Sequence, residues 1–136
     1  MVKAVDDVTL SVERGCTVGL VGESGSGKSV TAQSVLRIVP RPGKIIGGKI
    51  LFNGEDLLLK REEEIRKYRG KKISLIFQDP TSSLNPLFTI GSQLADIVIE
   101  HEKLKKDEAL DRVVKALKIV KLPDPEHAIY QFPHQF

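Results

Sequence analysis

One stretch decides the fold, Gly22-Glu23-Ser24-Gly25-Ser26-Gly27-Lys28-Ser29. It matches the pattern GxxxxGK[ST] in full, and it stands between an apolar run and a segment with helical spacing. Its glycines let the backbone wrap closely around an anion, and the following helix points the positive end of its dipole at the same place. Lys28 can reach the outer phosphates of a nucleotide as a point charge, and Ser29 offers its hydroxyl to Mg²⁺. The stretch therefore predicts a loop that binds phosphate.

A glycine-rich turn that merely connects a strand to a helix is the structural alternative. It accounts for the glycines but leaves Lys28 and Ser29 unexplained, so we discard it.

The sequence around the loop predicts strands before it and a helix after it. Residues 7–13 alternate between polar and apolar, and residues 16–21 form a second extended run. Helical spacing follows over residues 30–39 until two prolines forbid continuation. Residues 47–52 predict a further strand, and Asn53-Gly54 is a strong tight-turn signal. A small antiparallel sheet is expected here.

The character of the sequence changes near residue 79. Residues 62–67 predict a short solvated helix, and residues 73–77 predict a buried strand that ends at Gln78. Beyond Pro80, apolar stripes at residues 90–98 and 110–120 predict two amphipathic helices. We therefore expect an α/β fold in two parts, an incomplete nucleotide-binding core over 1–79 and an incomplete helical subdomain over 80–136.

Composition excludes several functional classes. The 136 residues are 40% hydrophobic and 29% charged, which fits a globular domain. The 21 basic and 18 acidic residues are interspersed, so nothing indicates a nucleic-acid partner. Apolar runs fall far short of the roughly 20 residues that span a bilayer, and no secretory signal is visible, so a cytoplasmic location is expected. Neither the single cysteine nor the three histidines indicate a metal or catalytic site.

A second motif selects among the many proteins that share a phosphate loop. The stretch Ile76-Phe77-Gln78-Asp79-Pro80-Thr81-Ser82-Ser83-Leu84-Asn85-Pro86 closely resembles the Q-loop of ABC ATPases in the oligopeptide, dipeptide and nickel importer family. The resemblance extends over nearly the whole chain, through residues 4–8, 19–29, 69–70 and 132–136. It implies the P-loop nucleotide-binding fold of that family, with Pro80 and Pro86 in the flexible joint before the helical subdomain.

The resemblance also implies ligands, partners and a role for Gln78. A neutral amide at the end of a strand can ligate Mg²⁺, orient the attacking water and sense the γ-phosphate. The implied function is that of an ATP-binding, energy-coupling subunit that imports peptides or a similar small solute, with ATP and Mg²⁺ as ligands. The implied partners are a second ATPase subunit, identical or different, and transmembrane permease subunits that hold the protein on the inner face of the membrane.

Parts of the family pattern are not found in the sequence. No run of four apolar residues followed by Asp-Glu occurs, and the Ser-Gly-Gly signature of the family would begin just beyond Phe136. The resemblance therefore implies a truncated, N-terminal part of the subunit, expected to be inactive or nearly so in isolation. The alternative is a phosphate-binding fragment or interaction module without catalysis. A soluble ABC protein of repair or translation is a further possibility, but as we recognise them those proteins lack this type of Q-loop.

Overall fold

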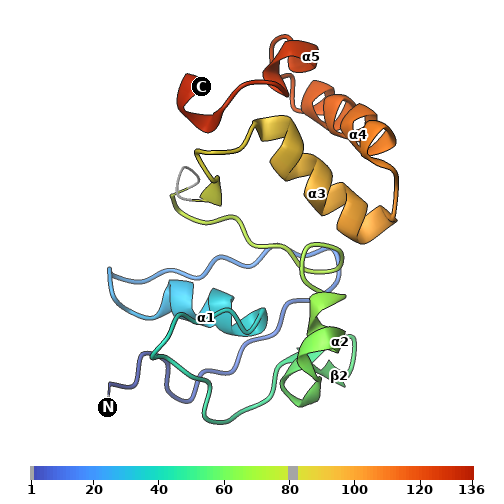
Figure 1. The fold of residues 1–136 in the computed structure, drawn as a ribbon. Helices are drawn as coiled ribbons and strands as arrows, with labels where there is room; N and C mark the ends of the chain where they lie inside the picture. Colours follow the sequence, from blue (N-terminus) through green and yellow to red (C-terminus); the bar gives the residue numbers. More distant parts are fainter. Residues whose placement is uncertain (1, 80–82) are drawn as a thin grey trace. The chain divides into compact units, whose positions relative to one another are not determined.

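The computed structural model describes residues 2–79 and 83–136, which divide into two compact units, Met1–Leu75 and Ile76–Phe136 (Figure 1). The first unit contains α1 (Lys28–Val35), β1 (Leu51–Phe52), β2 (Glu55–Asp56), the 3-10 helix η1 (Leu57–Leu59) and α2 (Glu62–Arg66). The second contains α3 (Ile90–Glu102), α4 (Lys106–Ile119), α5 (Pro125–Ala128) and the 3-10 helix η3 (Pro133–Gln135).

The helix after the phosphate loop is shorter than its sequence pattern predicts. α1 ends at Val35, and Arg37 has a left-handed backbone with φ 54°. The helix therefore stops before the two prolines are reached, because a left-handed residue cannot continue a right-handed helix. No residue within α1 is buried, and Leu36, which follows it, is 5% exposed.

The predicted antiparallel sheet is confirmed as a two-stranded hairpin. Leu51 pairs with Asp56 and Phe52 with Glu55. Asn53 and Gly54 form the turn with φ of 50° and 84°, as the Asn-Gly signal requires. A small core beside the hairpin contains Leu57, Ile65 and Tyr68, with the ring of Phe52 edge-on to Tyr68 at a centroid distance of 5.9 Å.

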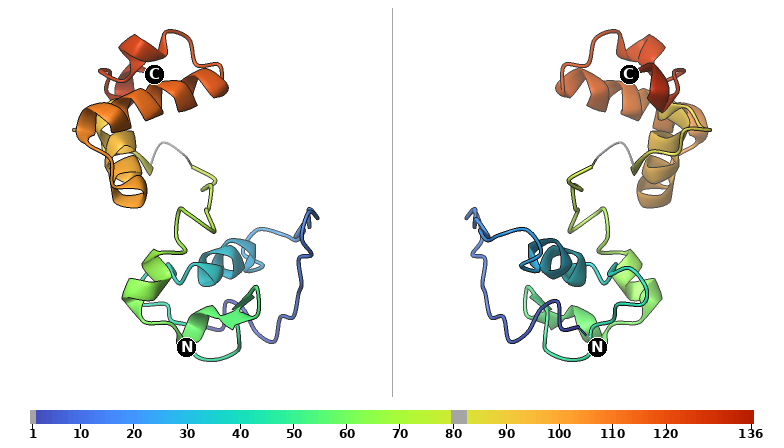
Figure 2. Two further views of the ribbon diagram at one scale, coloured as in Figure 1. Left: turned by 90° about the vertical axis from the view of Figure 1, so that its right-hand side faces the viewer. Right: turned by 90° about the vertical axis from the view of Figure 1, so that its left-hand side faces the viewer.

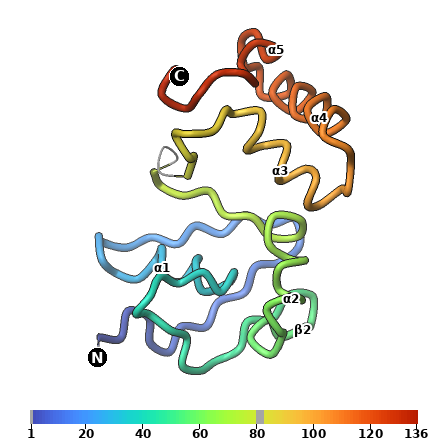
Figure 3. Tube along the Cα trace, viewed as in Figure 1, coloured from blue at the N-terminus to red at the C-terminus, as the bar shows by residue number. Residues whose placement is uncertain are grey.

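The strands predicted at 7–13, 16–21 and 73–77 are wrong as strands. Among the described residues the structure has β1 and β2 as its strands, with an isolated bridge between Arg69 and Ile73. The N-terminal segment, dark blue in Figure 3, runs without a helical coil up to the loop, and no strand is assigned in it. The predicted apolar face is not covered either, because Val8 is 54% exposed and Ile76 is 92% exposed. Alternation predicts extended backbone, but a strand also needs a neighbour that completes the ladder of hydrogen bonds.

The second unit is a helical hairpin, and the two helices predicted there are confirmed. α3 and α4 lie side by side in both views of Figure 2 and pack through Ala95, Ala109 and Val113. The N-terminus of α3 is capped by Thr89 Oγ1, which accepts from Ser92 N at 3.3 Å. In the part of the chain that the structure describes, no helix is long and apolar enough to cross a membrane.

Candidate phosphate-binding site

The eight residues of the predicted cradle lie together in one loop and the first turn of α1. A turn at Ser24-Gly25 closes with a hydrogen bond from Ser26 N to Glu23 O of 3.2 Å. Gly25 has φ 80° and Gly27 has φ 89°, a backbone region that side chains with a Cβ rarely adopt. Local sequence therefore accounts for the course of this loop.

Two of the glycines also have close neighbours, and the one at Gly27 is a backbone atom that leaves no room for a side chain. A Cβ on Gly27 would lie 2.4 Å from the carbonyl oxygen of Ala4, and one on Gly22 would lie 2.7 Å from Ser26 Oγ. The N-terminal segment thus passes directly against the loop at Ala4. A nucleotide-binding cradle needs this absence of side chains, because phosphate oxygens must approach the backbone closely.

Lys28 is held by the loop that precedes it. Its Nζ donates to Gly22 O at 2.8 Å, to Glu23 O at 2.6 Å and to Ser26 Oγ at 3.2 Å. An ammonium group has three donors, so these three acceptors satisfy it. The positive charge is therefore fixed beside the loop by the loop's own oxygen atoms, where it attracts anions.

The N-terminus of α1 presents backbone donors next to this charge. Gly27 is the N-cap and no side chain caps the helix, while Thr31 N makes the first hydrogen bond of the helix, to Gly27 O at 2.8 Å. The first turn contains no acidic residue, so nothing there repels an anion. Unpaired amides and the positive end of the helix dipole favour a bound phosphate at this point. Ser29 is exposed on the same turn.

Gln78 lies in the second unit, whereas the phosphate loop lies in the first. Its side chain is exposed in a bend, and the preceding Phe77 is 44% exposed, so Gln78 does not end a buried strand as predicted. Its role toward Mg²⁺, water and the γ-phosphate stays a prediction. Three other residues of the Q-loop stretch, Pro80, Thr81 and Ser82, lie outside the described residues.

Sequence reasoning missed the side chain that orders the end of the Q-loop stretch. The amide of Gln93, on α3, accepts from Asn85 N at 2.8 Å and donates to the carbonyls of Asn85 and Phe88, both at 3.0 Å. Asn85 Oδ1 in turn accepts from Leu87 N at 3.0 Å. No motif contains Gln93; only the glutamine's place one turn into a predicted helix could have pointed to it.

Glu55 and Lys60 form an ion pair in the part of the first unit that follows β1. Lys60 and the Tyr68 hydroxyl both donate to Glu55, the latter at 2.8 Å, and these bonds lower the pKa of the Glu55 carboxyl. The same contact with Glu55 raises the pKa of Lys60. Among residues 2–79 and 83–136, no three His, Cys, Asp or Glu side chains are grouped so that they could hold a metal ion.

Comparison with protein-family models matches residues 5–135 to the family described as "ABC transporter". The chain is 45% identical over 136 residues to the oligopeptide transport ATP-binding protein OppD of Bacillus subtilis (strain 168), and 42% identical over 135 residues to OppD of Escherichia coli (strain K12). It is 43% identical over 136 residues to the dipeptide transport ATP-binding protein DppD of Bacillus subtilis (strain 168). Each match covers 99% of this chain but only 38%, 40% and 41% of the respective relatives.

Proposed function

The chain belongs to the ABC transporter family, and from this premise we propose that it binds ATP for the energy-coupling subunit of an importer of peptides or a similar small solute. The observation that carries the proposal is the placement of Lys28. Its ammonium is fixed on the carbonyls of Gly22 and Glu23, beside the uncapped N-terminus of α1. The P-loop fold class predicted for the chain is that of the family it matches.

The proposed role of the loop is to hold the triphosphate by charge and by backbone amides. Gly22, Gly25 and Gly27 keep carbon atoms out of the cradle, and Glu23, Ser24 and Ser26 contribute backbone to its wall. Lys28 stabilises the phosphate charge without a proton transfer, since an ammonium has donors only. Binding in this way orients the nucleotide and leaves its phosphate chain in a fixed place.

Mg²⁺ fits the donor set proposed for it. The hydroxyl of Ser29 and the amide oxygen of Gln78 are hard, neutral oxygen ligands, which suit a cation that also keeps phosphate oxygens and water. When bound, Mg²⁺ neutralises phosphate charge during transfer of the γ-phosphoryl group. We propose that Gln78 also orients the attacking water.

The partners and location belong to the proposal as well. The relatives named above are transport ATP-binding proteins for oligopeptides and dipeptides, and the chain spans about two fifths of their length. For this protein we propose a second ATPase subunit, transmembrane permease subunits, and a cytoplasmic position on the inner face of the membrane. The proposed two-part division, a core over 1–79 and a helical subdomain over 80–136, places the joint at the Q-loop stretch.

A second candidate is a phosphate-binding module without catalysis. It is favoured by one sequence observation, the absence of four apolar residues followed by Asp-Glu anywhere in these 136 residues. This pair of acidic residues is what the family uses to hold Mg²⁺ and polarise water. The two candidates agree on nucleotide binding and differ on turnover.

Calorimetric titration with MgATP tests the binding proposal. Replacing Lys28 by alanine removes the positive charge beside the loop, which is expected to weaken binding by about 1.5–3 kcal/mol, or roughly tenfold to a hundredfold. Lys71→Ala is the matched control, because Lys71 is an exposed lysine of the same unit away from the loop. Equal affinities of the two variants would contradict the proposal. Steady phosphate release that is lost in Lys28→Ala would exclude the non-catalytic candidate.

A further inference from the structure

The C-terminal end of α1 has an arginine at a position where many helices have a glycine. Arg37 N donates to Ser34 O and Ile38 N donates to Gln33 O, both at 3.0 Å, the two bonds of a Schellman motif. In this motif the residue after the C-cap adopts a left-handed backbone, and Arg37 does so with φ 54°. Glycine avoids the steric cost of that conformation, so Arg37 adopts it at a cost, as Lys121 does after α4.

The side chain of Arg37 reaches a distant segment of the same unit. Its Nη1 donates to Lys60 O at 2.5 Å and to Leu57 O at 3.3 Å. Both carbonyls belong to η1 and the residue just after it, more than one element away along the chain. The strained position is therefore where the guanidinium can tie the end of α1 to η1.

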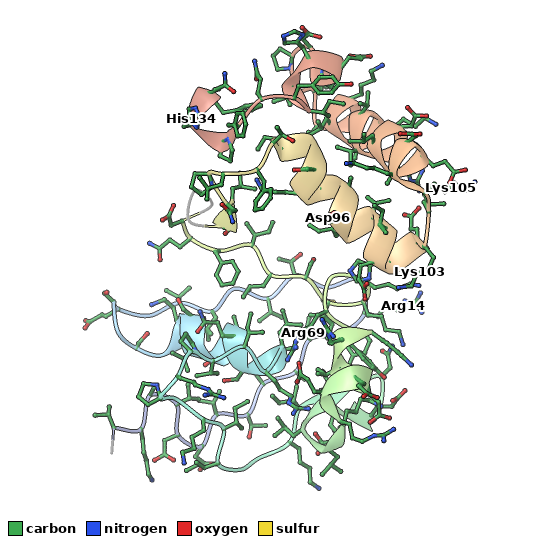
Figure 4. All side chains as sticks on the ribbon, in the orientation of Figure 1. Arg14, Arg69, Asp96, Lys103, Lys105 and His134 are labelled. Atoms are coloured by element: carbon green, nitrogen blue, oxygen red, sulfur yellow. The ribbon has the colours of Figure 1, made fainter. Side chains whose placement is uncertain are left out.

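A second arginine, Arg69, donates hydrogen bonds back to the end of α1. Arg69 Nε donates to Leu36 O at 2.8 Å, and its Nη2 donates to Arg37 O at 3.2 Å. Its remaining nitrogen, Nη1, pairs with Glu62 on α2, which lowers the pKa of that carboxyl. Figure 4 shows the Arg69 side chain between α1 and α2. Both carbonyls belong to the helix end that lacks partners within the helix.

These contacts matter because α1 has little else to hold it. The helix has eight residues, none of them buried, and an isolated helix of this length is unstable in water. Leu36 is the buried side chain at its end, and the amides proposed to bind phosphate lie at the opposite end. Fixing one end of a short rigid helix fixes the direction in which the other end points.

We propose that Arg37 and Arg69 are positioning residues for the phosphate loop: together they clamp the C-terminal end of α1 to η1 and α2. The pair holds the N-terminal amides of α1 in the place where the cradle needs them. The guanidinium groups also place positive charge near the negative end of the helix dipole. The expected effect on phosphate binding rests on the proposed function, whereas the expected effect on the stability of α1 does not.

Amide hydrogen exchange of the ligand-free chain tests the effect on the helix. Arg69→Met is expected to raise the exchange of the α1 amides from Thr31 onward by about tenfold, because two charge-assisted bonds to the helix end are lost. The amides of Ile65 and Tyr68, beside the small core, are expected to change far less. Arg66→Met is the matched control, since Arg66 is an exposed arginine on α2 without a bond to α1 among the described residues. α1 exchange equal to that of the control, or an equal rise over the whole unit, would overturn the proposal.

Two variants of Arg37 separate the backbone strain from the guanidinium bonds. Arg37→Gly removes the side chain but relieves the left-handed strain, whereas Arg37→Ala removes the side chain and keeps the strain. We expect α1 exchange to rise in both variants and more in the alanine variant. Exchange unchanged in both would overturn the role of Arg37.

Titration with magnesium tripolyphosphate tests the consequence for binding. Arg69→Met is expected to weaken binding about threefold to tenfold, with partial recovery in Arg69→Lys, which keeps the charge but loses the planar fork. Lys28→Ala distinguishes the possible failures. If it leaves binding unchanged, the proposed function fails, while the exchange data still decide the helix contacts. If it weakens binding and Arg69→Met does not, the positioning role is overturned.

Discussion

The phosphate loop with α1 and the α3–α4 hairpin are held by different kinds of contact. In the hairpin, Ala95, Ala109 and Val113 are 1%, 0% and 2% exposed, so apolar packing fixes both helices. In α1 no residue is buried, and hydrogen bonds from Lys28, Arg37 and Arg69 secure the loop and the helix. A loop with the proposed role of receiving a ligand must stay open to solvent, so its shape has to come from backbone geometry and polar contacts. The α3–α4 hairpin has no such requirement.

The largest effect is expected where the apolar packing between α3 and α4 is disrupted. Val113→Asp places an unpaired carboxylate at a position that is 2% exposed, and we expect a loss of about 3–5 kcal/mol in the stability of the second unit. Circular dichroism during thermal unfolding measures the loss of helix. Ala116→Asp, at an exposed position of the same helix, is the control and is expected to cost little. Similar unfolding of the two variants would mean that the core of the hairpin is not the main source of its stability.

A smaller effect is expected in the phosphate loop, where backbone conformation rather than side-chain packing determines the structure. Gly27→Ala combines a φ of 89° with a contact of 2.4 Å to Ala4 O, so we expect a cost of at least about 2 kcal/mol and loss of MgATP binding. Gly25→Ala has φ 80° but no atom within 4 Å, and it isolates the conformational cost alone. Binding titrations of both variants measure the difference. Equal affinities would show that the approach of Ala4 is unimportant.

The smallest effect concerns a polar contact outside the loop, and it appears as a pH dependence. The pKa of Glu55 lies below its ordinary 4.5, chiefly because of the hydrogen bond from Lys60 and then that from Tyr68. A lowered folded-state pKa stabilises the fold above pH 4.5, and this contribution is lost as the pH falls through the folded-state pKa. We expect melting temperatures of Glu55→Gln to fall less than those of the parent chain on acidification. Glu63→Gln, at an exposed position of α2, is the control and should follow the parent.

The features that the sequence predicts well are those whose causes are local. Gly22 to Ser29 form one loop because glycine conformations and helix initiation depend on neighbouring residues, and Asn53-Gly54 form a turn for the same reason. The apolar stripes of α3 and α4 predict helices that find each other within a few residues of chain. Each helix packs on the helix next to it in sequence, so the apolar stripe predicted from sequence is also the face that is packed.

The features that the sequence predicts poorly depend on distant partners. Residues 7–13 and 16–21 are predicted to be extended strands. A strand also needs backbone hydrogen bonds to a second segment, and the local pattern of one segment does not show whether that second segment is present. The side chain of Arg37, just after the end of α1, is bonded to carbonyls of residues 57 and 60. Arg69 likewise acts on residues more than thirty positions earlier, and no spacing rule connects them.

The contact between Gly27 and Ala4 has a practical consequence for anyone who produces the protein. The backbone of residue 4 forms part of the support beneath the loop, since its carbonyl oxygen would lie 2.4 Å from a Cβ at Gly27. An affinity tag joined on the amino-terminal side therefore extends a segment that touches the proposed nucleotide cradle. A tag joined after residue 136 leaves the sequence around residue 4 unchanged. Preparations intended for binding measurements should be tagged there.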